Sequence, residues 1–80
     1  EMSPEDRQAM IEGMVAQLSE RLATAGGPAE DWAKLIRALG VLQDTERASA
    51  IYDEAQTRFA GDDAALSFLK EAALEAGLVP

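Results

Sequence analysis

Three short breaks divide the chain into four segments, and they restrict the fold more than any other feature of the sequence. They lie at residues 26–28 (Gly-Gly-Pro), 43–44 (Gln-Asp) and 61–63 (Gly-Asp-Asp). Glycine accepts left-handed backbone angles and proline cannot continue a helix, so such clusters mark turns and helix ends. Because connections this short make successive helices antiparallel neighbours, the breaks favour a bundle. A chain of 80 residues divided in this way predicts one small all-α domain.

Within each segment, apolar residues recur at steps of three and four, which is the period of an amphipathic helix. No segment alternates with a period of two for long enough to predict a strand. The expected helices run from Ser3 and Pro4 to about Thr24, from after Pro28 to Val41 or Leu42, from Asp44 or Thr45 to before Gly61, and from Asp62 or Asp63 to before Gly77.

One apolar stripe on each helix is expected to form the core. Met10 and Met14 belong to the first stripe, so we expect both in the core, although methionines also suit adaptable binding surfaces. Met2 precedes that helix. The stripes consist of Met10, Ile11, Met14, Val15, Leu18 and Leu22; Trp32, Leu35, Ile36 and Leu39; Ala48, Ile51, Tyr52, Ala55 and Phe59; and Leu66, Phe68, Leu69, Ala72, Ala73 and Ala76.

The charge balance and the missing residue types exclude several classes of function. Fifteen acidic against seven basic residues give a net charge of −8, which repels nucleic acid and anionic membrane surfaces. The longest apolar run, residues 38–42, is too short to span a membrane. The chain has no cysteine and no histidine, so we predict no catalytic residue, no metal site and no cofactor, and hence no enzyme. Glu71 and Glu75 share a helix face, but we interpret them as surface charge.

A helical repeat signature spans the second and third segments. Trp32-x₂-Leu35, followed by Ala48-x₃-Tyr52 and Ala55, has the spacing of a tetratricopeptide (TPR) unit, in which large residues of one helix pack beside small ones of the next. The chain departs from that pattern at Ile36, Leu39 and Ala60. Residues 1–80 are therefore expected to form one TPR-like antiparallel hairpin with flanking capping helices. An unrelated helical hairpin is the alternative.

In the TPR family, the first helix of each pair lines a concave surface that receives a guest peptide. In this chain, the corresponding helices are the second and the fourth. Small residues there would admit a guest helix, apolar ones would hold its stripe, and acids would attract lysines. The predicted peptide-binding residues are Glu30, Ala33, Arg37, Gly40, Val41, Ala64, Ser67, Glu71, Leu74 and Glu75.

Most of the chain also resembles a specific family. The residues concerned are 3–11 (Ser-Pro-Glu-Asp-Arg-Gln-Ala-Met-Ile), 13–15 (Gly-Met-Val), Leu18, Arg21, Leu22, Trp32, Leu35, Arg37, Ala38 and Leu42. They resemble the periplasmic repeat region of c-type cytochrome biogenesis proteins of the CycH/CcmI kind. That resemblance implies a chaperone that holds the C-terminal helix of apocytochrome c for the haem ligation complex. It also implies a periplasmic location and a longer, membrane-anchored parent protein.

Two other functions remain open from the sequence. The chain could be a general scaffold that docks a different protein. It could also be a self-association module, in which the face left open by missing repeats pairs with a second copy.

Overall fold

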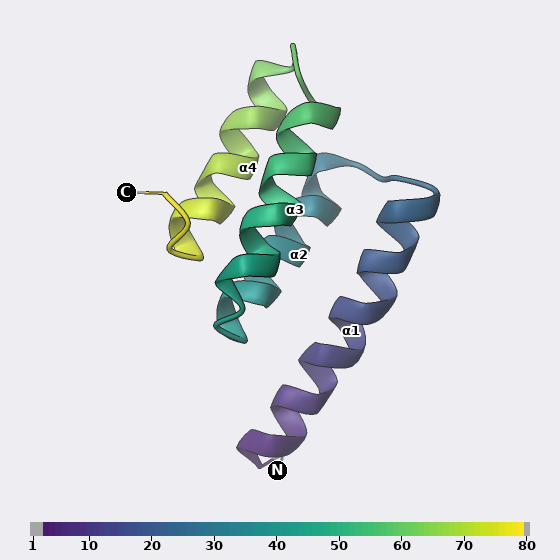
Figure 1. Ribbon diagram of the computed structural model, residues 1–80, viewed down its shortest axis with the longest axis vertical. Helices are drawn as coiled ribbons and strands as arrows, with labels where there is room; N and C mark the ends of the chain where they lie inside the picture. Colours follow the sequence, from purple (N-terminus) through teal and green to yellow (C-terminus); the bar gives the residue numbers. More distant parts are fainter. Residues whose placement is uncertain (1–2, 80) are drawn as a thin grey trace.

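The computed structural model describes residues 3–79, which form four helices and no strand (Figure 1). Successive helices run in opposite directions, as the short breaks predict. The bounds are α1 (Pro4–Thr24), α2 (Ala29–Val41), α3 (Thr45–Arg58) and α4 (Asp63–Glu75). The predicted all-α class and the four helices are confirmed.

Short polar side chains begin three of the four helices. Oxygens of Ser3, Asp44 and Asp62 accept backbone N–H groups three residues ahead, at 3.2, 3.2 and 3.1 Å. Each of these bonds satisfies a donor that the first turn of a helix leaves free. For α3, the N-cap is Asp44 and not Thr45. α2 follows Pro28 without a side-chain cap, and Glu30 and Asp31 in its first turn complement the helix dipole.

α2 is the central helix and packs against each of the other three. Its large residues Trp32, Leu35, Ile36 and Leu39 are at most 1% exposed, as the stripe predicts. The surrounding helices supply small buried residues, including Ala48 and Ala55 of α3 and Ala72 and Ala73 of α4. Large side chains on one helix thus lie among small ones on its neighbours, which brings the helices close together.

α2 packs very closely against the end of α4 at Gly40. A Cβ atom added to Gly40 would lie 2.8 Å from Ala76 Cβ and 3.0 Å from Ala76 Cα. Only glycine fits at this position, because real Cβ atoms do not approach that closely. Gly77 follows with a φ of 79°, a left-handed conformation typical of the residue after a helix end.

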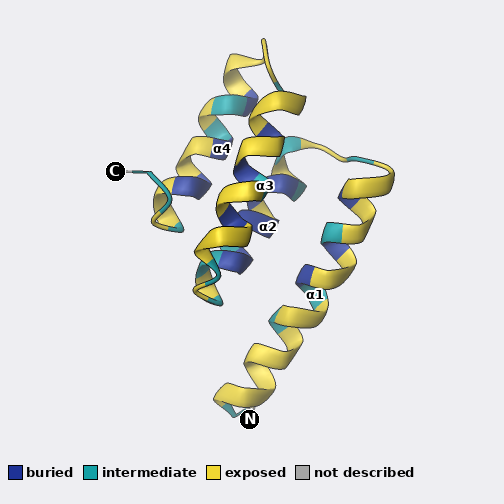
Figure 2. Cartoon of the chain, in the orientation of Figure 1, coloured by how far each residue is buried: buried dark blue, intermediate teal, exposed yellow. Residues whose placement is uncertain are grey.

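α1 packs against α2 alone among the helices of residues 3–79. All of its buried residues, Val15, Leu18 and Leu22, lie in its second half. No residue between positions 4 and 14 is buried, and Figure 2 shows these turns projecting from the bundle with exposed faces. The expectation that Met10 is a core residue is wrong, because it lies on this projecting half and is 59% exposed. Met14 is half-buried against the core, and Met2 lies outside the described residues.

None of the described helices is both long enough and apolar enough to cross a bilayer.

Candidate functional site: an apolar groove between the first two helices

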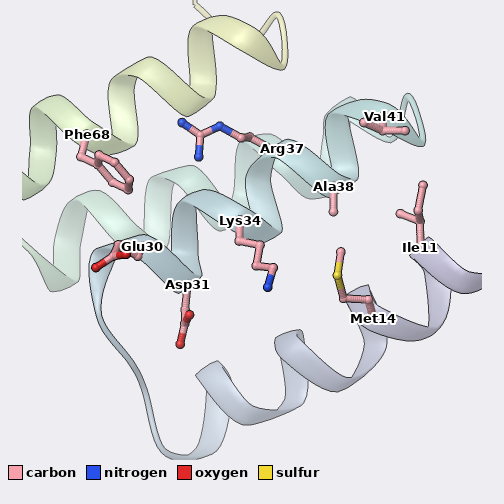
Figure 3. A pocket seen from close by; sticks show the side chains of 9 residues that line it. All are labelled: Ile11, Met14, Glu30, Asp31, Lys34, Arg37, Ala38, Val41 and Phe68. Atoms are coloured by element: carbon pink, nitrogen blue, oxygen red, sulfur yellow. The ribbon is translucent and has the colours of Figure 1, made fainter.

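A hollow of the described surface lies between α1 and α2 and is bordered at one edge by Phe68 of α4 (Figure 3). Its volume is about 520 Å³, within the range of pockets that hold ligands. We call it the α1–α2 groove. Its lining residues are Ile11, Met14, Glu30, Asp31, Lys34, Arg37, Ala38, Val41 and Phe68.

The difference in length between the two helices explains why this groove stays open. α1 has 21 residues and α2 has 13, so α1 is eight residues longer. The helices are antiparallel and are joined at the end of α1, so the excess extends past the end of α2 (Figure 1). A second hollow of about 210 Å³ follows this projecting half and shares Ile11 and Val41 with the groove. The two hollows therefore adjoin one another at Ile11 and Val41.

One end of the groove is apolar and open to solvent. Ile11 and Met14 of α1 face Ala38 and Val41 of α2 across it (Figure 3). Val41 is 67% exposed, although it is a large apolar residue in the last turn of α2. Together with the half-buried Ile11 and Met14, it leaves a continuous stretch of apolar surface partly open to water, and such surface is a usual mark of a binding site.

The other end of the groove is charged, and two of its four charges are paired. Asp31 accepts a hydrogen bond from Arg21 Nη2 at 2.6 Å. Arg37 is paired with Glu75 of α4, and its guanidinium lies 5.6 Å from the centre of the Phe68 ring. This arginine therefore fixes α4 against the groove wall by a charge pair and a cation–π contact.

The other two charges at this end are available to a ligand. No ion pair among residues 3–79 involves Glu30 or Lys34, although their i, i+4 spacing favours one. Both side chains are exposed. Lys34 extends toward the space between α1 and α2 (Figure 3).

The structure brings some of the predicted peptide-binding residues together and separates others. Glu30, Arg37 and Val41 line the α1–α2 groove. Arg37 also borders a separate hollow of about 330 Å³ along the α2–α4 seam, whose other lining residues are Glu71, Leu74 and Glu75. The predicted surface therefore corresponds to two adjoining hollows that share one arginine.

Four predicted residues lie elsewhere. Ala33 is fully buried, so its assignment to a binding surface is wrong: it lies on the packed side of α2. Gly40 packs against Ala76 at the end of α4 and lines neither hollow. Ser67 lines a different hollow, together with residues of α3, and Ala64 is exposed in the first turn of α4.

Sequence reasoning missed six residues of the groove. Ile11, Met14 and Phe68 belong to apolar stripes and were therefore expected in the core, but they are only half-buried. The signal that could have found the first two is the length of the first apolar stripe, because it runs from Met10 to Leu22 and is longer than the stripe of α2, which runs from Trp32 to Leu39. The six residues are Ile11, Met14, Asp31, Lys34, Ala38 and Phe68.

The groove offers apolar contacts and charged rims, which together suit the binding of an amphipathic segment. Within residues 3–79, no group of three or more acidic side chains is placed to hold a metal ion.

Comparison with known proteins identifies two relatives. The chain is 36% identical over 78 residues to the cytochrome c-type biogenesis protein CycH of Bradyrhizobium diazoefficiens, and the match covers 98% of this chain and 21% of that protein. It is 44% identical over 54 residues to the protein of the same name from Rhizobium meliloti, covering 66% of this chain and 14% of that protein. No family model matches the chain. No solved structure matches it either. The chain thus spans about a fifth or less of the length of these relatives.

Proposed function

Because this chain belongs to the family of CycH cytochrome c-type biogenesis proteins, we propose that it acts in cytochrome c maturation as a peptide-binding module. In this proposal the α1–α2 groove holds the C-terminal helical segment of apocytochrome c for the haem ligation complex. The role is one of binding and presentation, not of catalysis. The module is a TPR-like hairpin, formed by α2 and α3, with α1 and α4 at its two ends.

The observation that carries this proposal is the open apolar end of the groove. Val41 is 67% exposed, and Ile11 and Met14 are only half-buried beside it. A guest helix that places its apolar stripe here would remove these side chains from water, at a gain of about 25 cal/mol for each Å² of apolar surface. Recognition of an amphipathic helix by an apolar groove is a common mode of peptide binding.

The dimensions of the groove also suit a helix. The lining residues of α2 extend from Glu30 to Val41, a rise of about 16 Å at about 1.5 Å per residue. A guest helix of about three turns covers that length. The second hollow along α1 lets the guest continue past the end of α2.

The net charge of −8 favours a basic client over an acidic one. Such a charge attracts a positively charged segment over long range and raises its association rate, and salt weakens the effect. The same charge opposes the pairing of two copies of this chain, which is the alternative function. In the parent protein, we place the module in the periplasm and assign membrane attachment to other segments.

A calorimetric titration tests the proposal. The wild-type chain is titrated with a synthetic peptide of the C-terminal segment of an apocytochrome c, and then the Val41→Asp variant is titrated. We expect binding to weaken at least tenfold, because an aspartate at this position places a charge against the apolar stripe of the guest. Circular dichroism is expected to show unchanged helicity, since Val41 is exposed.

The Leu74→Asp variant is the matched control. Leu74 is 45% exposed and lies in the hollow along the α2–α4 seam, outside the α1–α2 groove. We expect its affinity to equal that of the wild type. If Leu74→Asp weakens binding and Val41→Asp does not, the guest lies on the seam and our placement is wrong. An absence of heat with the wild-type chain, or a stable dimer in light scattering at the working concentration, contradicts the proposed function itself.

A further inference from the structure

We infer that the α1–α2 groove selects its guest helix by the order of the charges along that helix, which we call the charge register. The preferred guest is an amphipathic helix with an acidic residue one turn beyond its apolar stripe and a basic residue one turn beyond that. This inference rests on the proposed function, because it specifies the pattern of the helix that the same groove binds.

The free charges of the groove are the first step of the argument. Asp31 is neutralised by Arg21, and Arg37 by Glu75. Glu30 and Lys34 have no ion-pair partner within residues 3–79, yet both line the groove and are exposed. A guest therefore meets one uncompensated negative charge and one uncompensated positive charge.

The order of these charges along α2 is the second step. Val41 and Ala38 form the apolar end, Lys34 follows one turn toward the start of the helix, and Glu30 follows one further turn. Four residues of an α-helix rise about 6 Å, and one turn of the guest rises about 5.4 Å. A guest helix lying along the groove thus presents successive turns to the apolar end, to Lys34 and to Glu30.

Complementarity then defines the guest. The turn opposite Lys34 carries an acid, and the turn opposite Glu30 carries a base. The order of the acid and the base is counted outward from the apolar stripe. It is therefore the same whether the guest chain runs parallel or antiparallel to α2. Exposed ion pairs add little affinity, but exchanging the two charges places like charges together at both positions, so the pattern contributes mainly to specificity.

Two synthetic helical peptides of identical composition provide the test. Both carry the same leucine stripe. In the first, a glutamate comes one turn after the stripe and a lysine one turn later, and in the second these two residues are exchanged. We expect the wild-type chain to bind the first peptide about fivefold more tightly at low salt, and the preference to shrink at high salt.

The charge-exchange variant Glu30→Lys/Lys34→Glu is expected to invert the preference, while its net charge remains that of the wild type. Two peptides and two proteins, the wild type and the charge-exchange variant, give four affinities. A difference in helicity between the peptides affects both proteins equally, so it cancels when the two preferences are compared. The matched control exchanges Lys70 and Glu71, which are exposed on α4 and do not line the groove (Lys70→Glu/Glu71→Lys). This control is expected to keep the wild-type preference.

Equal binding of the two peptides by the wild type overturns the inference, and so does a preference that the groove exchange leaves unchanged or that the control exchange inverts. If the apocytochrome c segment still binds in those cases, the proposed function stands without the charge register. If neither that segment nor either synthetic peptide binds, both proposals fail.

Discussion

The two ends of the molecule differ in how much of their apolar surface they bury. From α2 to α4, the predicted stripes supply most of the buried core, including all four large stripe residues of α2, and Gly40 lets α2 pack closely against Ala76 at the end of α4. The first half of α1, by contrast, has an equally apolar stripe but no buried residue. The same helical pattern thus forms a core in one region and an open surface in the other.

The difference separates the buried core of this small domain from the surface to which we assign binding. None of the residues in the first turns of α1 belongs to the buried core. Those turns, freed from packing, form one wall of the groove. The guest that we propose would use this apolar surface, which lies outside the fully buried core.

The largest effect we expect comes from Trp32, at the centre of the packed region. The variant Trp32→Ala is expected to lose about 3–5 kcal/mol of unfolding free energy, because the side chain is 1% exposed and its removal leaves a cavity. Chemical denaturation measures the loss. Trp32→Phe is the control and is expected to cost less than half as much, since it keeps an aromatic ring and removes an indole N–H that has no hydrogen-bond partner within residues 3–79. A loss below about 1 kcal/mol in Trp32→Ala contradicts this position for the indole.

The contrast between the two halves of α1 is tested by a pair of truncations. Leu22→Ala is expected to cost about 2–4 kcal/mol, because Leu22 is 1% exposed in the packed half. Met10→Ala is expected to change the unfolding free energy by less than about 0.5 kcal/mol, because Met10 is 59% exposed in the projecting half. Thermal and urea unfolding of both variants provide the measurement. Comparable losses would mean that the first half of α1 is packed in solution.

Effects smaller than those of Trp32→Ala and Leu22→Ala distinguish two helical glycines. Gly40→Ala is expected to destabilise the domain by about 1–2 kcal/mol, because the new methyl group meets the backbone of Ala76 and this crowding outweighs the gain in helix propensity. Gly13→Ala is expected to stabilise it by up to about 1 kcal/mol, since nothing lies within 4 Å of the added Cβ in α1. Denaturation midpoints of the two variants are compared. A stabilising Gly40→Ala would show that α2 and α4 do not approach as closely as described.

Part of the candidate site could be predicted from the sequence. Glu30, Arg37 and Val41 lie off the apolar stripe of α2, and the structure places all three in the groove. The remaining wall could not be predicted in the same way, because Ile11 and Met14 have the spacing of core residues. Periodicity shows that a face is apolar, but not whether another helix is long enough to cover it.

The sequence by itself determined the four helices, the Ser3 cap of the first and the stripe of α2 that becomes the core. These features depend on local backbone preferences and on the helical period, which neighbouring residues specify. Only the tertiary structure decided that Ala33 is buried, that Gly40 packs against Ala76, and that the first turns of α1 contain no buried residue. These outcomes depend on how helices of unequal length cross and end against one another, which is a property of the whole packed domain.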